Sequence, residues 1–179
     1  LPLFLSAHGA SQSDVGIIMG TYTLSSVLCR PWISRMIDQI GRKRSFTWGS
    51  LVLVISPLLY LFAQGQVSEL YPVLLAIRAL HGLGLAICIT AAFTYASDII
   101  PPERLNEGIG VFGISGLSGL ALGAPLAEVI IRYGGFGASF QAASALALLG
   151  LTVHLRLPES FRHPADGPSA ASFTAILRK

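Results

Sequence analysis

Charged side chains are scarce in this sequence. Of its 179 residues, only 12% are Asp, Glu, Lys or Arg, whereas 53% are hydrophobic. A soluble domain carries about a quarter charged residues. The shortage of charge therefore excludes an ordinary soluble enzyme of this size and favours a membrane protein.

Several chemical motifs are also lacking. The two cysteines, Cys29 and Cys88, lie in separate hydrophobic segments, which argues against a disulfide framework and a zinc site. No phosphate-binding loop of the Gly-x-x-x-x-Gly-Lys-Ser/Thr type occurs, so ATP-driven transport has no support within this sequence. The net charge is +3, but the basic residues lie in short polar breaks rather than on one face. The sequence therefore indicates no cofactor, no metal ion and no nucleic-acid partner.

Long hydrophobic runs are what the sequence has instead. A bilayer core about 30 Å thick needs about 20 apolar residues in a helix. Residues 1–5 have the character of the outer end of one such helix, so we interpret the chain as a fragment whose first helix is mostly absent. Five further windows predict membrane-spanning helices at 15–34, 46–63, 71–97, 108–131 and 138–155.

The distribution of basic residues predicts the orientation. Loop 35–44 and the residues after the last span carry most of the Lys and Arg, whereas the opposite side offers only Arg132. The positive-inside rule places the charged loops in the cytoplasm of a bacterial cell, beneath the plasma membrane. Residues 1–159 then form the membrane bundle. Residues 160–179, with a short helix at 173–179, begin a cytoplasmic linker to a carboxyl-terminal half outside this sequence.

The loop between the first two full spans carries a recognisable motif. Residues 30–44 read RPWISRMIDQIGRKR. This resembles the signature of the major facilitator superfamily between its second and third helices, in which Gly, three residues, Asp, two residues, Gly and Arg are followed by Arg or Lys. Gln39 stands where the family often has a basic residue. The matching positions, with Ser in place of the family's first Gly, are Ser34, Asp38, Gly41, Arg42 and Lys43.

The resemblance implies an all-α integral membrane fold, the amino-terminal six-helix bundle of the major facilitator fold. It also implies that Asp38 and Arg42 belong to a gate that holds the two halves of a transporter together on the cytoplasmic side. A simpler interpretation is that Arg42 to Arg44 only set the topology. Asp38 favours the gate, because a carboxylate has no role in topology but can pair with an arginine.

Two glycine-containing patterns extend the resemblance. Arg78, followed by Gly82 and Gly84, is similar to the fourth helix of the family. A later run is similar to the glycine-proline pattern of the fifth helix in the drug or sugar:proton antiporter branch, although Ala124 separates a glycine and a proline that are adjacent there. We predict that these small residues allow close helix packing or a hinge. The run comprises Gly113, Gly116, Gly119, Gly123 and Pro125.

Arg78 lies inside a hydrophobic span and therefore needs a polar partner. Glu128 lies at a similar depth on the next span, so we predict that the two side chains interact directly or through water. The alternative is that Glu128 sits at the headgroup boundary beside Arg132. His81, three residues after Arg78, could titrate or could make an interhelical hydrogen bond. The resemblance implies that the fourth-helix arginine tunes a carboxylate that carries a proton.

Three classes of function remain open from the sequence. The favoured one is a secondary active transporter that exports small molecules by alternating access with proton coupling. Its partners would be the bilayer, a small-molecule substrate, protons and the other half of the chain. A second is a transport-inactive sensor or scaffold of the same fold. The least favoured is a membrane enzyme, because Asp38 and Asp98 lie far apart without metal-ligand spacing around either.

Overall fold

The computed structural model of this protein describes residues 1–63 and 65–160, and the helix expected at 173–179 lies outside this part. All of its regular elements within these ranges are helices, so the all-α prediction is confirmed. In chain order they are α1 (Pro2–Ala7), α2 (Gln12–Leu28), α3 (Arg30–Ile40), α4 (Arg42–Phe62), α5 (Val67–Ile99), the 3-10 helix η1 (Pro102–Arg104) and α6 (Leu105–Leu155).

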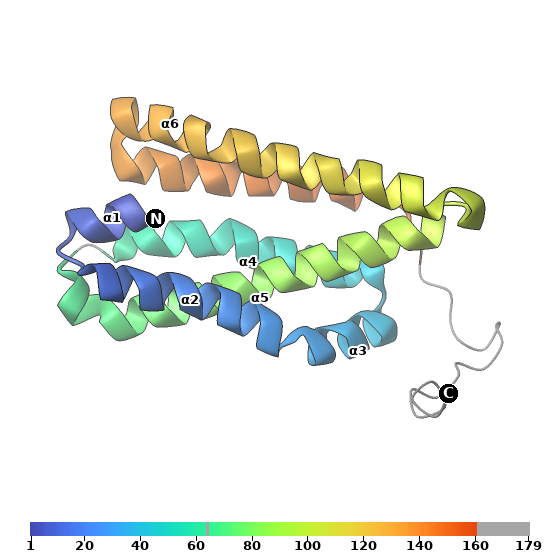
Figure 1. Ribbon diagram of the computed structural model, residues 1–179, viewed down its shortest axis with the longest axis horizontal. Coiled ribbons are helices and arrows are strands. Elements are labelled where there is room, and N and C mark those ends of the chain that lie inside the picture. Colours follow the sequence, from blue (N-terminus) through green and yellow to red (C-terminus); the bar gives the residue numbers. More distant parts are fainter. Residues whose placement is uncertain (64, 161–179) are drawn as a thin grey trace.

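The helices form two layers (Figure 1). Helix α6 folds back on itself at Gly135, whose φ of 75° and ψ of −178° leave the helical region. This divides α6 into a first limb (105–134) and a second limb (136–155), which lie side by side above α2, α4 and α5. Helices α4 and α5, and the stretch 102–155, are each long and apolar enough to cross a membrane.

The single span expected over 15–34 is divided in the structure. Helix α2 ends at Leu28, Cys29 caps it, and α3 covers most of the segment expected to be a loop. Pro31 lies in the first turn of α3, where its missing N–H and fixed φ favour a new helix start over continuation of α2. Helix α3 is amphipathic, because Ile33 and Ile37 are buried while its polar side chains are exposed.

The start of α2 is fixed by a capping box. The backbone N–H of Asp14 donates to Ser11 Oγ, and the backbone N–H of Ser11 donates to the Asp14 carboxylate. Hydrogen bonds from Ser11 lower the pKa of Asp14. The capping box therefore gives α2 a defined first turn.

Two glycines of α5 lie at close helix crossings. An added Cβ at Gly82 would collide with the backbone oxygen of Tyr22 in α2, and the Ser25 hydroxyl beside it donates to the Ala79 carbonyl at 3.1 Å. Gly84 faces Gly49 of α4, where an added Cβ on Gly49 would lie 3.0 Å from the Gly84 oxygen. The backbones of α2, α4 and α5 therefore approach closely, as small residues in membrane bundles allow.

The glycines of α6 have a different environment. A Cβ added at any of four positions along the first limb would meet no atom within 4 Å in the described part of the chain. Within the described ranges, close packing occurs at the glycines of α5 but at none of these α6 positions, where the packing or hinge role stays a prediction. The four open positions are Gly113, Gly116, Gly119 and Gly123.

We expect Gly82→Ala to destabilise the bundle by about 1–3 kcal/mol, because the new methyl group would collide with backbone that cannot move independently of its helix. Gly116→Ala is the matched control, since the same substitution there enters open space. The measurement is the thermal unfolding midpoint of each purified variant in detergent micelles. Equal midpoints for the two variants would contradict the predicted role of Gly82 in packing.

Candidate functional site

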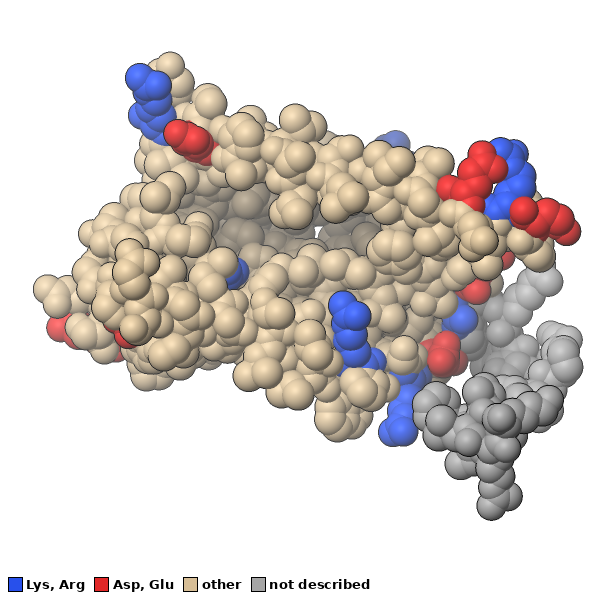
Figure 2. Space-filling view, in the orientation of Figure 1, with Lys and Arg blue, Asp and Glu red and all other residues tan. Residues whose placement is uncertain are grey.

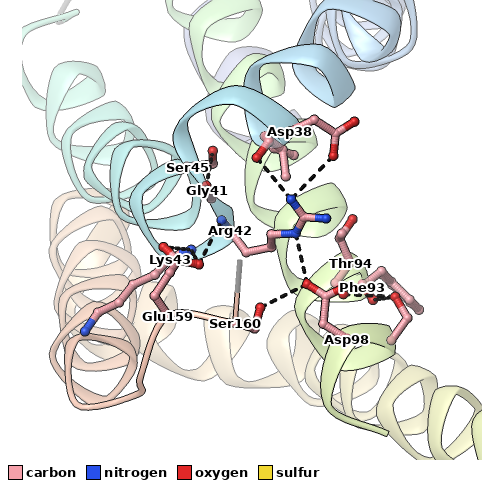
Figure 3. Close-up of polar contacts among 12 residues, drawn as sticks. Asp38, Gly41, Arg42, Lys43, Ser45, Phe93, Thr94, Asp98, Glu159 and Ser160 are labelled. Carbon is pink, nitrogen blue, oxygen red and sulfur yellow. Dashed lines mark hydrogen bonds and ion pairs between the residues drawn. The ribbon is translucent and has the colours of Figure 1, made fainter. Parts of the chain in front are cut away.

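Arg42 lies at the centre of a charged cluster at one end of the bundle (Figure 3). Its Nε donates to Asp98 Oδ2 at 2.9 Å, and its Nη1 lies 3.4 Å from Asp38 Oδ1. Asp38 belongs to α3, Arg42 begins α4 and Asp98 lies near the end of α5. One guanidinium therefore links three helices. We call Asp38, Arg42, Asp98 and Glu159 the Arg42 cluster.

The two ion pairs of Arg42 differ in their exposure to solvent. The Arg42 side chain is 14% exposed, and that of Asp98 is 28% exposed, whereas that of Asp38 is 69% exposed. Screening by water weakens exposed pairs, so the contact with Asp98 contributes more than the contact with Asp38. The sequence motif identified Asp38 and Arg42 but not the stronger partner.

Gly41 allows the chain to turn from α3 directly into α4. Its φ of 95° lies in the region that other residues rarely adopt, and an added Cβ would lie 2.8 Å from Glu159 Oε2. The turn therefore favours glycine through its backbone conformation, and the carboxylate of Glu159 lies directly against it. It places Arg42 and Lys43 as the first two residues of α4.

Glu159 caps the start of α4 although it lies beyond the end of α6. Its carboxylate accepts hydrogen bonds from the backbone N–H groups of Arg42 and Lys43 at 3.1 Å. A carboxylate at this position pairs with otherwise unsatisfied donors and with the positive end of the helix dipole. Nearby, the His154 ring makes a hydrogen bond to the Lys43 carbonyl at 3.1 Å. The second limb of α6 is thus fastened to the motif.

The structure brings together most of the motif residues predicted from the sequence. Asp38, Gly41, Arg42 and Lys43 meet through these contacts, whereas Ser34 lies exposed on α3. Sequence reasoning did not assign Asp98 and Glu159 to the cluster. The sequence could have indicated both residues, because each follows a predicted span that ends on the same side of the membrane as the basic loop.

Arg78 is buried between α2, α4 and α5, with only 6% of the residue exposed. Its Nη2 donates to Met19 Sδ at 2.8 Å, and its guanidinium carbon lies 4.7 Å from the centre of the Tyr22 ring. The Tyr22 ring also meets the edge of the His81 ring, with centres 5.4 Å apart. A sulfur and an aromatic face therefore contact this cation.

Three buried polar atoms near Arg78 have no hydrogen-bond partner in the described part of the chain. They are Arg78 Nε, the Tyr60 hydroxyl and His81 Nδ1. An unpaired buried polar group costs free energy, so these three atoms lower the stability of the packed bundle.

No direct contact between Arg78 and Glu128 is present in the described ranges, and a contact through water stays a prediction. The ion pairs in residues 1–63 and 65–160 join Arg42 to Asp38 and Asp98, and Arg104 to Glu107. Arg78 lies against α2, whereas Glu128 and Arg132 are exposed on the first limb of α6. Similar depth in the membrane does not place two side chains on facing sides of their helices.

A groove of about 640 Å³ separates α5 from the first limb of α6. The aromatic rings of Tyr22, Phe93 and Phe112 line it, together with Gly113 and Gly116. The open glycines of α6 therefore border a largely apolar space. Figure 2 shows the molecule hollowed between these layers.

Long apolar helices, a fold-back at Gly135 and a charged cluster at one end of the bundle define a multi-pass helical membrane protein. The chain belongs to the Major Facilitator Superfamily, whose family model matches residues 1–179. The resemblance noted in the sequence is thereby confirmed.

Curated relatives include proteins named for drug resistance. The chain is 27% identical to Multidrug resistance protein 2 of Bacillus subtilis (strain 168) over 83% of its own length and 36% of that protein. It is 30% identical to Multidrug resistance protein 3 of the same strain over 70% of its length and 25% of that protein. It is 24% identical to Quinolone resistance protein NorA of Staphylococcus aureus over 88% of its own length and 39% of that protein. The chain thus spans well under half the length of these relatives.

We expect Glu159→Ala to lower the stability of the bundle by about 1–2 kcal/mol, because the first N–H groups of α4 lose their acceptor. Glu103→Ala removes the same charge from an exposed residue of η1 and serves as the control. Thermal unfolding in detergent should show a lower midpoint for Glu159→Ala alone. A midpoint equal to that of the control would contradict the capping role.

Proposed function

We propose that this chain is part of a secondary active transporter that moves small molecules across a membrane by alternating access. The observation that carries the proposal is the Arg42 cluster, in which one guanidinium joins α3, α4 and α5 while Glu159 fastens the end of α6. Membership of the Major Facilitator Superfamily supports it.

The Arg42 cluster is suited to a gate because its contacts are strong enough to order one end of the bundle and weak enough to break. Charge-assisted hydrogen bonds contribute about 1.5–3 kcal/mol when shielded and less when exposed. Energies of this size can be offset by substrate or proton binding elsewhere, which shifts the population between two conformations. On the positive-inside rule, this end of the bundle faces the cytoplasm.

We further propose that transport is proton-coupled efflux through the plasma membrane. The drug-resistance names of the curated relatives support small organic substrates. The buried cation of Arg78 supports coupling, because a positive charge in a shielded site favours deprotonation of any carboxylate that comes near it. His81 and Glu128 remain the candidate titrating partners, and the fold-back and glycines of α6 remain candidate hinge positions.

The main alternative function is a sensor that has the same fold but transports nothing. It would keep the Arg42 cluster and would bind ligands in the groove beside Tyr22 and Phe93, but it would carry no net flux. Flux assays on the whole protein therefore separate the two functions.

We expect Asp98→Asn to reduce substrate flux more than Asp38→Asn does. Loss of the shielded partner of Arg42 costs about 1.5 kcal/mol, a factor of about ten in the gate equilibrium, whereas the exposed Asp38 contributes less. The measurement is flux by the whole protein in liposomes under an imposed pH gradient, with Glu103→Gln as the control. Unchanged flux in Asp98→Asn would refute the gate.

A second experiment tests coupling at Arg78. In liposomes, we expect Arg78→Gln to abolish the increase in flux that a pH gradient produces, while substrate exchange without a gradient continues. Arg78→Lys, which keeps the charge, should retain part of the response. If the unmodified protein carries the same flux with and without a pH gradient, the antiport proposal is wrong.

A further inference from the structure

A groove of about 750 Å³ lies on the outside of the bundle, beside the turn between α3 and α4. Lys43 and Arg44 line one part of it, and Trp48, Leu51 and Leu155 line another. The groove is distinct from the space between α5 and the first limb of α6, because the two have no lining residue in common. The groove thus combines cationic and apolar surface.

Neither cationic side chain of this groove is paired with a carboxylate in the described ranges. Arg42 is paired with Asp38 and Asp98, but the side chains of Lys43 and Arg44 make no ion pair or hydrogen bond there. The carboxylate of Glu159 also borders the groove, where it accepts hydrogen bonds from backbone N–H groups. Figure 3 shows the Lys43 side chain directed away from Asp38 and Asp98. Two cations therefore face the groove against one engaged carboxylate.

The apolar side chains continue from the cations along α4. Trp48 lies one turn beyond Arg44, and Leu51 lies about 10 Å along the helix axis from Arg44 at 1.5 Å per residue. Trp48 is 63% exposed, and Leu155 on the second limb of α6 is also exposed beside the same groove. Exposed tryptophan next to cations is typical of the boundary between headgroups and hydrocarbon.

We propose that this groove binds an anionic phospholipid. The phosphate of the headgroup contacts Lys43 and Arg44, and an acyl chain lies along Trp48, Leu51 and Leu155. Charge complementarity selects an anionic lipid over a zwitterionic one, because only the former brings a net negative charge to two unpaired cations. The apolar part of the groove selects a lipid over a free phosphate ion, which would leave Trp48 and the leucines exposed.

The test compares lipids on the purified protein in detergent micelles. We expect phosphatidylglycerol to raise the unfolding midpoint and to remain bound in native mass spectrometry, whereas phosphatidylcholine does neither. In Lys43→Gln/Arg44→Gln, binding of phosphatidylglycerol should weaken at least tenfold. The matched control Arg30→Gln/Arg35→Gln removes two exposed cations from α3 outside the groove and should bind as the unmodified protein does.

Two further arms keep the proposal open to refutation. Inorganic phosphate and glycerol 3-phosphate at equal concentration should not reproduce the shift, and an equal shift from either would show a free-anion site instead. Trp48→Ala retains both cations and should weaken the binding of phosphatidylglycerol at least threefold. This variant tests the proposal even if the double variant does not fold. Equal losses in the two double variants, or equal binding of the two lipids, would overturn the proposal.

Discussion

The Arg42 guanidinium is the interaction on which this end of the molecule depends. A cation at the first residue of a spanning helix needs neutralisation, and it obtains this from Asp98 at 2.9 Å and from Asp38 on the neighbouring helix. The turn at Gly41, whose φ of 95° favours glycine, brings Arg42 to that position and places the first N–H groups of α4 against the Glu159 carboxylate. Arg42 therefore joins α3, α4 and α5, and Glu159 fastens the end of α6 to the same turn.

The fold class and part of the site could be predicted because hydropathy and charge are properties of sequence windows. Runs of apolar residues predicted the long helices, and the motif from Asp38 to Lys43 predicted part of the Arg42 cluster. The direction in which a side chain points around its helix cannot be read from the average hydropathy or charge of a sequence window. Arg78 and Glu128 were matched by depth, yet Arg78 turns toward Met19 and Tyr22. Asp98 and Glu159 were missed because their role comes from contacts more than 50 residues away in the chain.

Glycine has two physical roles here that look identical in the sequence. On α5, a methyl group at Gly82 would collide with the backbone of α2, and one at Gly84 would collide with Val52 of α4. On the first limb of α6, Gly113 and Gly116 border an apolar groove and have open space above them. The first pair stabilises a fixed interface. The second pair leaves open surface beside the groove.

Because α6 folds back at Gly135, a change in the backbone angles there would rotate the whole first limb. At 1.5 Å per residue, residues 105–134 form an arm about 45 Å long, so a rotation of about 5° at Gly135 moves the far end by about 4 Å. The second limb is fixed by the hydrogen bonds of Ser144 to Val54 and of His154 to Lys43. The far end of the arm joins α5 through η1, a few residues from Asp98. A small torsional change at Gly135 would therefore displace the chain by several ångströms beside the carboxylate that pairs with Arg42.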